Sequence, residues 1–301
     1  MEYPKYKTIL CERDREEPHI LYITLNRPEK FNAISIGPQE MTGELQDAVM
    51  RADIDDQVKV VIFKGAGQHF SVGFDLEQVY RVYGGSQDVR PYQSTRLIID
   101  ETQIGFARAI LNCKKVTIAQ VHGWCIEAGM WIPICCDIAI AAKNAMFAHR
   151  GQRLAFGGMP FMPLELFLGH NKKIVELLIT GRTISGEEAE QIGMITKAVE
   201  PEELRSEVYN LAKAICVLPL DAIVMGKYSR RCAYEALGMS TSLLGVVFHT
   251  LGTNIRYRPE EREMIFLEKR EKLGTKRAFH LYHERFEDLL NKTKYFKSYG
   301  G

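Results

Sequence analysis

The sequence predicts an α/β fold, in which a sheet with helical crossovers is followed by a helical C-terminal region. In the first half, short apolar runs rich in β-branched residues alternate with amphipathic helical patterns, as strands joined by crossover helices do. From about residue 172 onward, the strand patterns give way to successive helical ones. The composition, with 46% hydrophobic and 26% charged residues among 301, is normal for a globular chain.

The first three elements are predicted by the spacing of their apolar residues. Residues 19–28 (HILYITLNRP) alternate apolar and polar side chains and stop at a proline, which indicates a half-buried strand. Residues 37–52 place apolar side chains at helical spacing, and Pro38 marks the expected start of this amphipathic helix. Residues 58–67 form a β-branched run that ends in glycines, as a fully buried strand does.

Two helices and two strands follow. Residues 75–83 have a helical pattern, and residues 96–112 repeat apolar side chains along one broad helical face. The runs KVTIAQVHG (115–123) and DIAIAA (137–142) are again typical of strands. The alternation therefore continues to about residue 142.

The remainder of the chain predicts helices. Their segments are 172–181, 185–194, 201–218 and 219–250, separated by turn glycines and prolines. The tail over 259–292 is charged and helical, with Ala278, Leu281 and Phe286 among its apolar residues. Such a tail usually presents a solvated face, but its aromatic residues need a partner surface in the chain's own core or on another subunit.

Charge and cysteine content exclude several classes of protein. The 39 basic and 38 acidic residues leave a net charge of +1, which disfavours nucleic-acid binding through bulk electrostatics but leaves room for a local phosphate-binding patch. The seven cysteines are odd in number and form no Cys-x-x-Cys pair, which favours a reduced, cytoplasmic protein over a disulfide scaffold or zinc site. The longest apolar segment, 123–142, is interrupted by Glu127, Pro133 and Asp137, so no membrane-spanning helix is expected.

Four segments carry a family resemblance. They are LNRPEKFNAIS (25–35), VVIFKGAGQHFSVGFDLEQV (60–79), KKVTIAQVHGWCIEAGMWIPICCDIAIAAKNAMFA (114–148) and TGRTISGEEAEQIGMITKAVEPEEL (180–204). In this order they resemble the motifs of the crotonase family, also called the enoyl-CoA hydratase/isomerase superfamily. The resemblance runs from about residue 8 to residue 290. One such motif would be weak evidence, but four in register are specific for the fold.

The resemblance implies a crotonase (ClpP-like) ββα spiral core over residues 1–200 and a helical region over 201–301 that builds a homotrimer or a homohexamer. It also implies an acyl-CoA thioester as the small-molecule partner. Coenzyme A would arrive as part of the substrate, and neither a metal ion nor a redox cofactor is expected.

The same resemblance implies an oxyanion hole and CoA contacts. Members of the family bind the thioester carbonyl with two backbone N–H groups, which by motif position would here belong to Phe74 and Ala128. Two such donors in a dry site stabilise an enolate oxygen strongly. The family often has small residues at the first donor and consecutive glycines at the second, so Phe74, Glu127 and Ala128 predict a differently shaped pocket. Arg27 and Lys30 occupy positions where the family contacts CoA, although both also fit a solvated turn.

The two glutamates of the family's hydratases have no acidic counterpart at the matching positions. The first position falls on Trp131, and the second falls on Gly151 or, with the longer spacing, on Arg153. None of these side chains transfers a proton as a carboxylate does. The sequence therefore predicts that the protein is not a standard two-glutamate hydratase.

Three interpretations remain open. In the first, Glu127 and His149 take over proton transfer, because both titrate and both lie near the motif positions. In the second, Arg150 or Arg153 binds a substrate carboxylate during decarboxylation or carbon–carbon cleavage of a cyclic acyl group, with Trp131 as a flat apolar wall of the pocket. In the third, the protein is a non-catalytic subunit that binds CoA esters.

Overall fold

The computed structural model describes residues 2–83, 92–151, 153, 169–236 and 266–300. Part of the predicted helix 219–250 and the start of the charged tail lie outside these residues. Within them the predicted α/β fold is confirmed.

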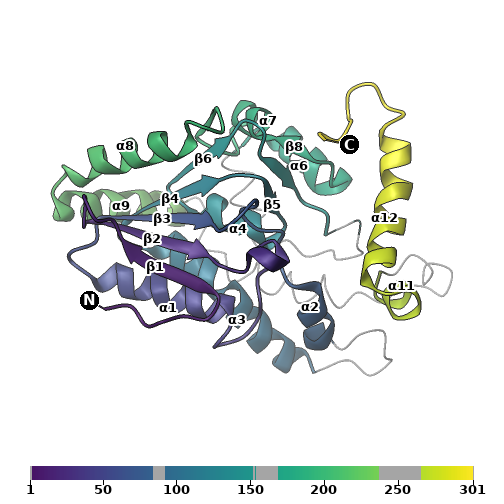
Figure 1. Ribbon diagram of the computed structural model, residues 1–301, viewed down its shortest axis with the longest axis horizontal. Coiled ribbons are helices and arrows are strands. Elements are labelled where there is room, and N and C mark those ends of the chain that lie inside the picture. Colours follow the sequence, from purple (N-terminus) through teal and green to yellow (C-terminus); the bar gives the residue numbers. More distant parts are fainter. Residues whose placement is uncertain (1, 84–91, 152, 154–168, 237–265, 301) are drawn as a thin grey trace.

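The main sheet has six strands in the order β1-β2-β3-β4-β6-β9 (Figure 1). Their bounds are Ile9–Arg13, Ile20–Leu25, Val60–Gly65, Val116–Val121, Ile138–Ala142 and Lys197–Val199. β1 pairs antiparallel with β2, whereas every other pair is parallel, as crossover connections require. The first four residues of β3 are all buried, so side chains cover both faces of this strand, as its β-branched run predicts.

A second, three-stranded sheet consists of β5 (Trp124–Ile126), β7 (Met146–Ala148) and β8 (Ile184–Ser185). The sequence patterns do not reveal these strands, because two or three residues are too few to show a period. β5 and β7 pair in parallel, which places the segment after Ile126 beside the segment after Ala148.

The helices of the first half pack against the main sheet and against one another. α1 (Met41–Ile54) contacts β1 and β2, α3 (Gln93–Asn112) lies along α1, and α4 (Ala128–Cys135) contacts α3. α2 (Leu76–Tyr83) follows directly after the loop that ends at Asp75. The predicted start of the first helix at Pro38 is wrong: Pro38 lies in a turn, and the helix begins three residues later, at Met41.

Every element described beyond residue 200 is a helix. The bounds are α8 (Leu204–Cys216), α9 (Leu220–Ala236), α11 (Phe266–Leu273) and α12 (Thr275–Leu290), preceded by α6 (Asn171–Thr180) and α7 (Gly186–Gln191). The tail is two helices rather than one, because Gly274 adopts φ +80° between α11 and α12. The division into units at residue 200 stays a prediction.

The apolar residues of the tail have different environments. Ala278 is fully buried, whereas Leu281 and Phe286 are 44% and 36% exposed on the single chain. α12 therefore docks on its own chain by one face and leaves apolar side chains on another. The predicted homo-oligomer remains a proposal. Among the described residues no single helix is long and apolar enough to cross a membrane, although the bent pair α8–α9 passes that test by length and composition when its helices are combined.

Candidate functional site

The loop after β3 lies directly against β5 and the start of α4. The backbone N–H of Ser71 donates to the carbonyl of Trp124, and the N–H of Ile126 donates to the carbonyl of Ser71, each at 2.9 Å. These bonds fix residues 71–75 beside the segment that leads into α4. The two motifs predicted to supply the oxyanion donors are thus brought together by the fold.

Two glycines permit this close approach. A Cβ at Gly73 would lie 2.8 Å from the Cβ of Glu127 and 3.3 Å from the backbone nitrogen of Ala128, and Gly73 has φ +84°. A Cβ at Gly129 would lie 2.8 Å from the carbonyl oxygen of Ser71. Both positions therefore need glycine, because any side chain would push the loop away from α4.

The backbone N–H groups of Phe74 and Ala128 take no part in the hydrogen bonds that hold their two segments in place. The carbonyl of Gly73 accepts from the N–H of Ile34 at 2.7 Å. Because this carbonyl shares one trans peptide unit with the N–H of Phe74, that N–H points the opposite way. Ala128 is the first residue of α4, so its N–H has no acceptor within the helix and lies at the positive end of the helix dipole. This geometry suits an oxyanion, although the role of both donors stays a prediction.

Glu127 has an unusual backbone conformation. Its φ of 50° and ψ of −124° are normally adopted by glycine, and its N–H donates to the carbonyl of Ala148 at 3.1 Å. One carboxylate oxygen accepts the backbone N–H of Arg150, and the other lies 3.8 Å from Nδ1 of His149. The structure thus places the two predicted proton-transfer residues side by side, and Glu127 directly precedes the predicted donor Ala128.

The strain at Glu127 predicts an inverted order of stability between two variants. Glu127→Gly and Glu127→Ala both lose the carboxylate and differ only in the Cβ. At most positions the glycine variant is the less stable, by about 1 kcal/mol. Here we expect Glu127→Gly to be the more stable, by about 1 kcal/mol, because glycine adopts this φ and ψ without strain. Urea denaturation measures the difference, and an alanine variant of equal or greater stability would contradict the strain.

His149 lies behind Glu127 rather than at the surface. It is 4% exposed and lines a cavity of about 10 Å³ whose other walls are apolar. Those walls are Met130, Phe147, Ala148, Ile174, Leu177, Leu178, Ile184 and Met194. Because the side chain of Glu127 is 27% exposed, it is the more accessible member of the pair.

Trp131 packs inside an aromatic cluster. Its ring meets Phe74 edge to face with centroids 5.1 Å apart, and it stacks on Phe106 of α3 at 6.1 Å. It is only 5% exposed. An aromatic side chain thus lies directly against Phe74, and the match of Trp131 to the hydratases' first glutamate stays a prediction.

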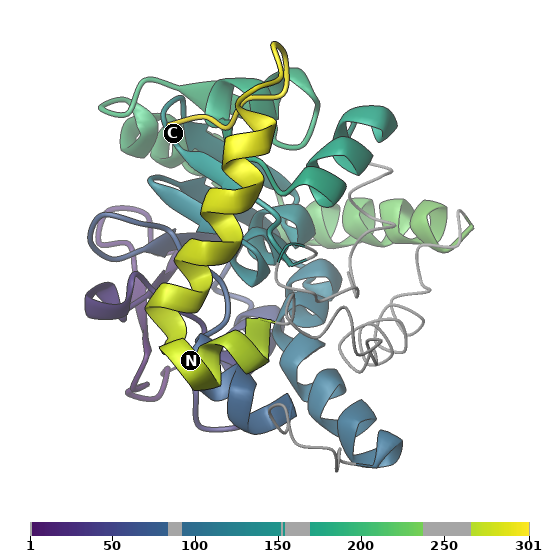
Figure 2. The same cartoon turned by 90° about the vertical axis from the view of Figure 1, so that its right-hand side faces the viewer.

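Arg153 is buried and Arg150 is half-buried, and the two side chains contact different elements. The Arg150 guanidinium donates to Oγ1 of Thr183 at 2.8 Å and lies over the Trp124 ring. Arg153 donates through Nη1 to Glu287 at 2.6 Å and contacts Nδ1 of His283 at 3.3 Å. The C-terminal helix α12, which crosses this side of the molecule in Figure 2, therefore covers the segment after β7.

The charges of this cluster perturb their neighbours. Burial, together with the nearby Arg150 and Arg153 guanidinium groups, lowers the pKa of His283 to about 3, so its ring is neutral at physiological pH. Burial by itself would raise the pKa of Glu287, but hydrogen bonds from Arg153 and Ser298 hold it below its usual range. Sequence reasoning missed His283 and Glu287; their spacing of four residues places them on one helical face, but nothing local links them to Arg153.

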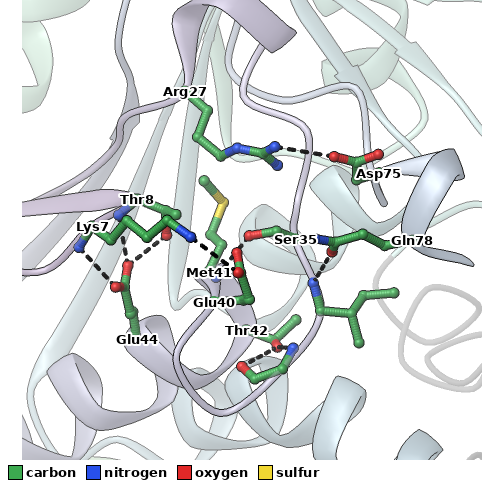
Figure 3. Close-up of polar contacts among 12 residues, drawn as sticks. Lys7, Thr8, Arg27, Ser35, Glu40, Met41, Thr42, Glu44, Asp75 and Gln78 are labelled. Atoms are coloured by element: carbon green, nitrogen blue, oxygen red, sulfur yellow. Dashed lines mark hydrogen bonds and ion pairs between the residues drawn. The ribbon is translucent and has the colours of Figure 1, made fainter. Parts of the chain in front are cut away.

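The two predicted CoA contacts lie beside Asp75. Arg27 donates to Asp75 at 3.0 Å, as Figure 3 shows, and to the carbonyl of Ala33 at 2.6 Å. Lys30 lies 3.4 Å from the same carboxylate and is 45% exposed, whereas the Arg27 side chain is only 14% exposed. The Arg27 guanidinium thus has a structural role within the loop, and Lys30 is the more accessible cation. Contact of either residue with CoA stays a prediction.

The Arg27–Asp75 pair predicts a loss of stability in acid. Burial alone would raise the pKa of Asp75, but the hydrogen bond from Arg27 and the charge of Lys30 hold it below its ordinary value near 4. The stability that ionised Asp75 contributes is therefore complete above about pH 4 and is lost as the pH falls through the lowered pKa. We expect the free energy of unfolding of Asp75→Asn to lie below that of the wild type at neutral pH and to approach it in acid.

Urea denaturation between pH 7 and pH 3 checks this expectation. The matched control is Asp56→Asn, because Asp56 is exposed. A difference between Asp75→Asn and the wild type that stays constant over the whole range would contradict the role of the charge.

Comparison with known proteins places the chain in a family. The sequence pattern of the enoyl-CoA hydratase/isomerase family matches residues 15–272. EchA13 of Mycobacterium tuberculosis, which is named as an enoyl-CoA hydratase, is 33% identical over 263 residues, covering 81% of this chain and 78% of EchA13. The peroxisomal Δ(3,5)-Δ(2,4)-dienoyl-CoA isomerase of Arabidopsis thaliana is 30% identical over 224 residues, covering 71% of this chain and 78% of the isomerase.

A crystal structure of an enoyl-CoA hydratase from Mycobacterium smegmatis superposes with a TM-score of 0.81 at 26% identity and covers 99% of both chains. The chain therefore belongs to the enoyl-CoA hydratase/isomerase family, and the predicted crotonase fold is confirmed.

Proposed function

We propose that the protein processes an acyl-CoA thioester by stabilising the thioester enolate between the backbone N–H groups of Phe74 and Ala128. Two relatives named as an enoyl-CoA hydratase and a dienoyl-CoA isomerase support the substrate class. The observation that carries the proposal is the approach of the two loops at Gly73, because it directs both N–H groups away from competing acceptors and holds them close together. Fixed donors of this kind stabilise developing negative charge by several kcal/mol, about 3 for each donor in comparable sites.

Glu127 is the proposed base of this reaction, and His149 positions it. Glu127 directly precedes the donor Ala128, so its side chain leaves the backbone next to the position expected for the thioester. The Arg150 N–H donates to one of its oxygens, and Nδ1 of His149 lies 3.8 Å from the other. Such a carboxylate removes a proton from the carbon next to the thioester, and the oxyanion donors stabilise the resulting enolate.

The proposal excludes the two-glutamate hydration route. In this assignment Trp131 replaces one glutamate, and Gly151 or Arg153 replaces the other, so no carboxylate pair activates a water molecule. Arg150 and Arg153 favour a second candidate, which is a hydrolase, lyase or decarboxylase that breaks a carbon–carbon bond in a cyclic acyl group. A non-catalytic subunit that binds CoA esters is the alternative outside the enzymes.

A panel of thioesters tests the proposal. The purified protein is incubated with alicyclic and β-ketoacyl-CoAs, and the masses of the products are followed. We expect turnover of at least one thioester. Binding of thioesters without turnover would favour the non-catalytic subunit, and absence of binding would contradict the proposal. If Glu127→Gln and His149→Ala both keep full activity, the assignment of the base is wrong.

A further inference from the structure

Four side chains at the C-terminal helix form a polar cluster in which two are buried and two are half-buried. Arg150 and Arg153 come from the segment after β7, and His283 and Glu287 come from α12, the yellow helix that crosses the front of the molecule in Figure 2. Arg153 is 6% exposed and His283 is 8% exposed, so more than nine-tenths of each is buried. Side chains that are 130 or more positions apart in sequence thus meet in one region, in which Arg150 and Glu287 are half-buried.

Several polar atoms of the cluster have partners. Nε of Arg153 donates to the carbonyl of Thr180 at 2.5 Å, and Nη1 donates to Glu287 at 2.6 Å. One guanidinium nitrogen of Arg150 donates to Thr183 at 2.8 Å. These bonds hold both guanidinium groups in place.

Four other polar atoms in the cluster are buried and have no hydrogen-bond partner. They are Nε of Arg150, Nη2 of Arg153, Nε2 of His283 and Oε2 of Glu287. Buried polar groups almost always find a partner in proteins, so four orphaned atoms in one place indicate a bound group that completes the cluster.

The donor or acceptor character of the orphaned atoms indicates the charge of the bound group. A guanidinium only donates, so Nδ1 of His283 must accept from Arg153, and the proton of the neutral ring is on Nε2. Three of the four orphaned atoms are therefore donors. Glu287 pairs with Arg153, and Glu127 is a second negative charge near Arg150, with a smaller effect on it than that of Glu287. The little positive charge that remains argues against a doubly charged phosphate, whereas planar guanidinium groups with free N–H donors suit carboxylate oxygens.

We propose that Arg150, Arg153 and His283 bind a carboxylate carried by the acyl group of the thioester, remote from the reacting carbonyl. The inference rests on the proposed function and names the substrate class: an acyl-CoA with a second, free carboxylate. The site is within reach of the thioester because Glu127, next to the donor Ala128, accepts the backbone N–H of Arg150. Oε2 of Glu287 accepts from a water molecule beside the bound carboxylate.

Binding of matched, saturated thioesters to the full-length protein tests the inference. Adipyl-CoA and hexanoyl-CoA have six acyl carbons and differ in the terminal carboxylate; glutaryl-CoA and pentanoyl-CoA form a shorter pair. In isothermal titration, we expect adipyl-CoA or glutaryl-CoA to bind at least about tenfold more tightly than the partner of its pair that lacks the carboxylate. Charged hydrogen bonds in a buried site provide a gain of this size. Arg150→Met and His283→Phe should remove most of this preference and leave hexanoyl-CoA binding within about twofold. Arg277→Met, at an exposed position of α12, is the control.

The outcomes separate this inference from the function on which it rests. Equal binding within both pairs overturns the carboxylate site and leaves the acyl-CoA function standing, and it would mean that water alone fills the cluster. A preference that survives both variants also overturns the site. If Arg150→Met instead weakens hexanoyl-CoA but not hexanoyl-pantetheine, the cluster binds CoA phosphates and the assignment is wrong. If no thioester binds at all, the proposed function fails as well.

Discussion

Replacing Glu127 by glutamine is expected to lower the rate of α-proton exchange in an acyl-CoA by about 10²–10⁴-fold, with little change in KM. Glutamine keeps the size of the side chain and its contact with the Arg150 N–H, but it does not accept the proton. Incubation of hexanoyl-CoA with the protein in D₂O, followed by mass spectrometry, measures the exchange directly. The assay needs no knowledge of the physiological product, because formation of the enolate and its return to the thioester are enough to replace the proton by deuterium.

Two further variants show whether the effect belongs to Glu127. Glu284→Gln changes an exposed carboxylate on α12 and should exchange at the wild-type rate. His149→Asn should lower the rate less than Glu127→Gln and shift its pH profile, because His149 lies 3.8 Å from the Glu127 carboxylate. Full activity of Glu127→Gln would mean that another group removes the proton.

Gly73→Ala is expected to lower kcat by about 10²–10³-fold, the usual loss when an oxyanion donor is displaced. The new Cβ would lie 2.8 Å from the Cβ of Glu127 and 3.3 Å from the Ala128 nitrogen. It must therefore separate the Phe74 loop from α4 and pull the two N–H groups apart. The φ of +84° also disfavours alanine, so the free energy of unfolding should fall by about 1–3 kcal/mol.

Gly226 provides the matched control for this substitution. It lies in α9, and a Cβ there would meet nothing within 4 Å. Gly226→Ala should keep full activity and gain about 0.5–1 kcal/mol of stability, because alanine favours a helix. Normal kcat in a folded Gly73→Ala protein would contradict the placement of the two donors.

The sequence predicted the parts of the fold that depend on local pattern. The β-branched run of β3 and the apolar stripe of α1 recur at periods that a strand and a helix require, and both elements form there. The donors Phe74 and Ala128 came from motif position, and the close contact at Gly73 brings their loops together.

What the sequence did not predict depends on long-range contacts. Arg27 is directed inward because its partner Asp75 is buried, and the two residues are 48 positions apart in the sequence. His283 and Glu287 reach Arg153 only because α12 returns across the molecule, and no local pattern encodes that path. The strain at Glu127 is equally invisible in sequence, because it arises where the residue is held between β5 and α4.

The central claim is that this site forms an acyl-CoA enolate but lacks the glutamate pair of a hydratase. Hydration of crotonyl-CoA tests this claim most directly. With the purified protein in excess, the formation of 3-hydroxybutyryl-CoA is followed by mass spectrometry against a protein-free control. We expect a rate close to the control, in a preparation that does exchange the α-protons of hexanoyl-CoA. Hydration at an ordinary enzymatic turnover, about 1–10³ per second, would contradict this claim and would show that a pair of acid and base groups activates the water in this site.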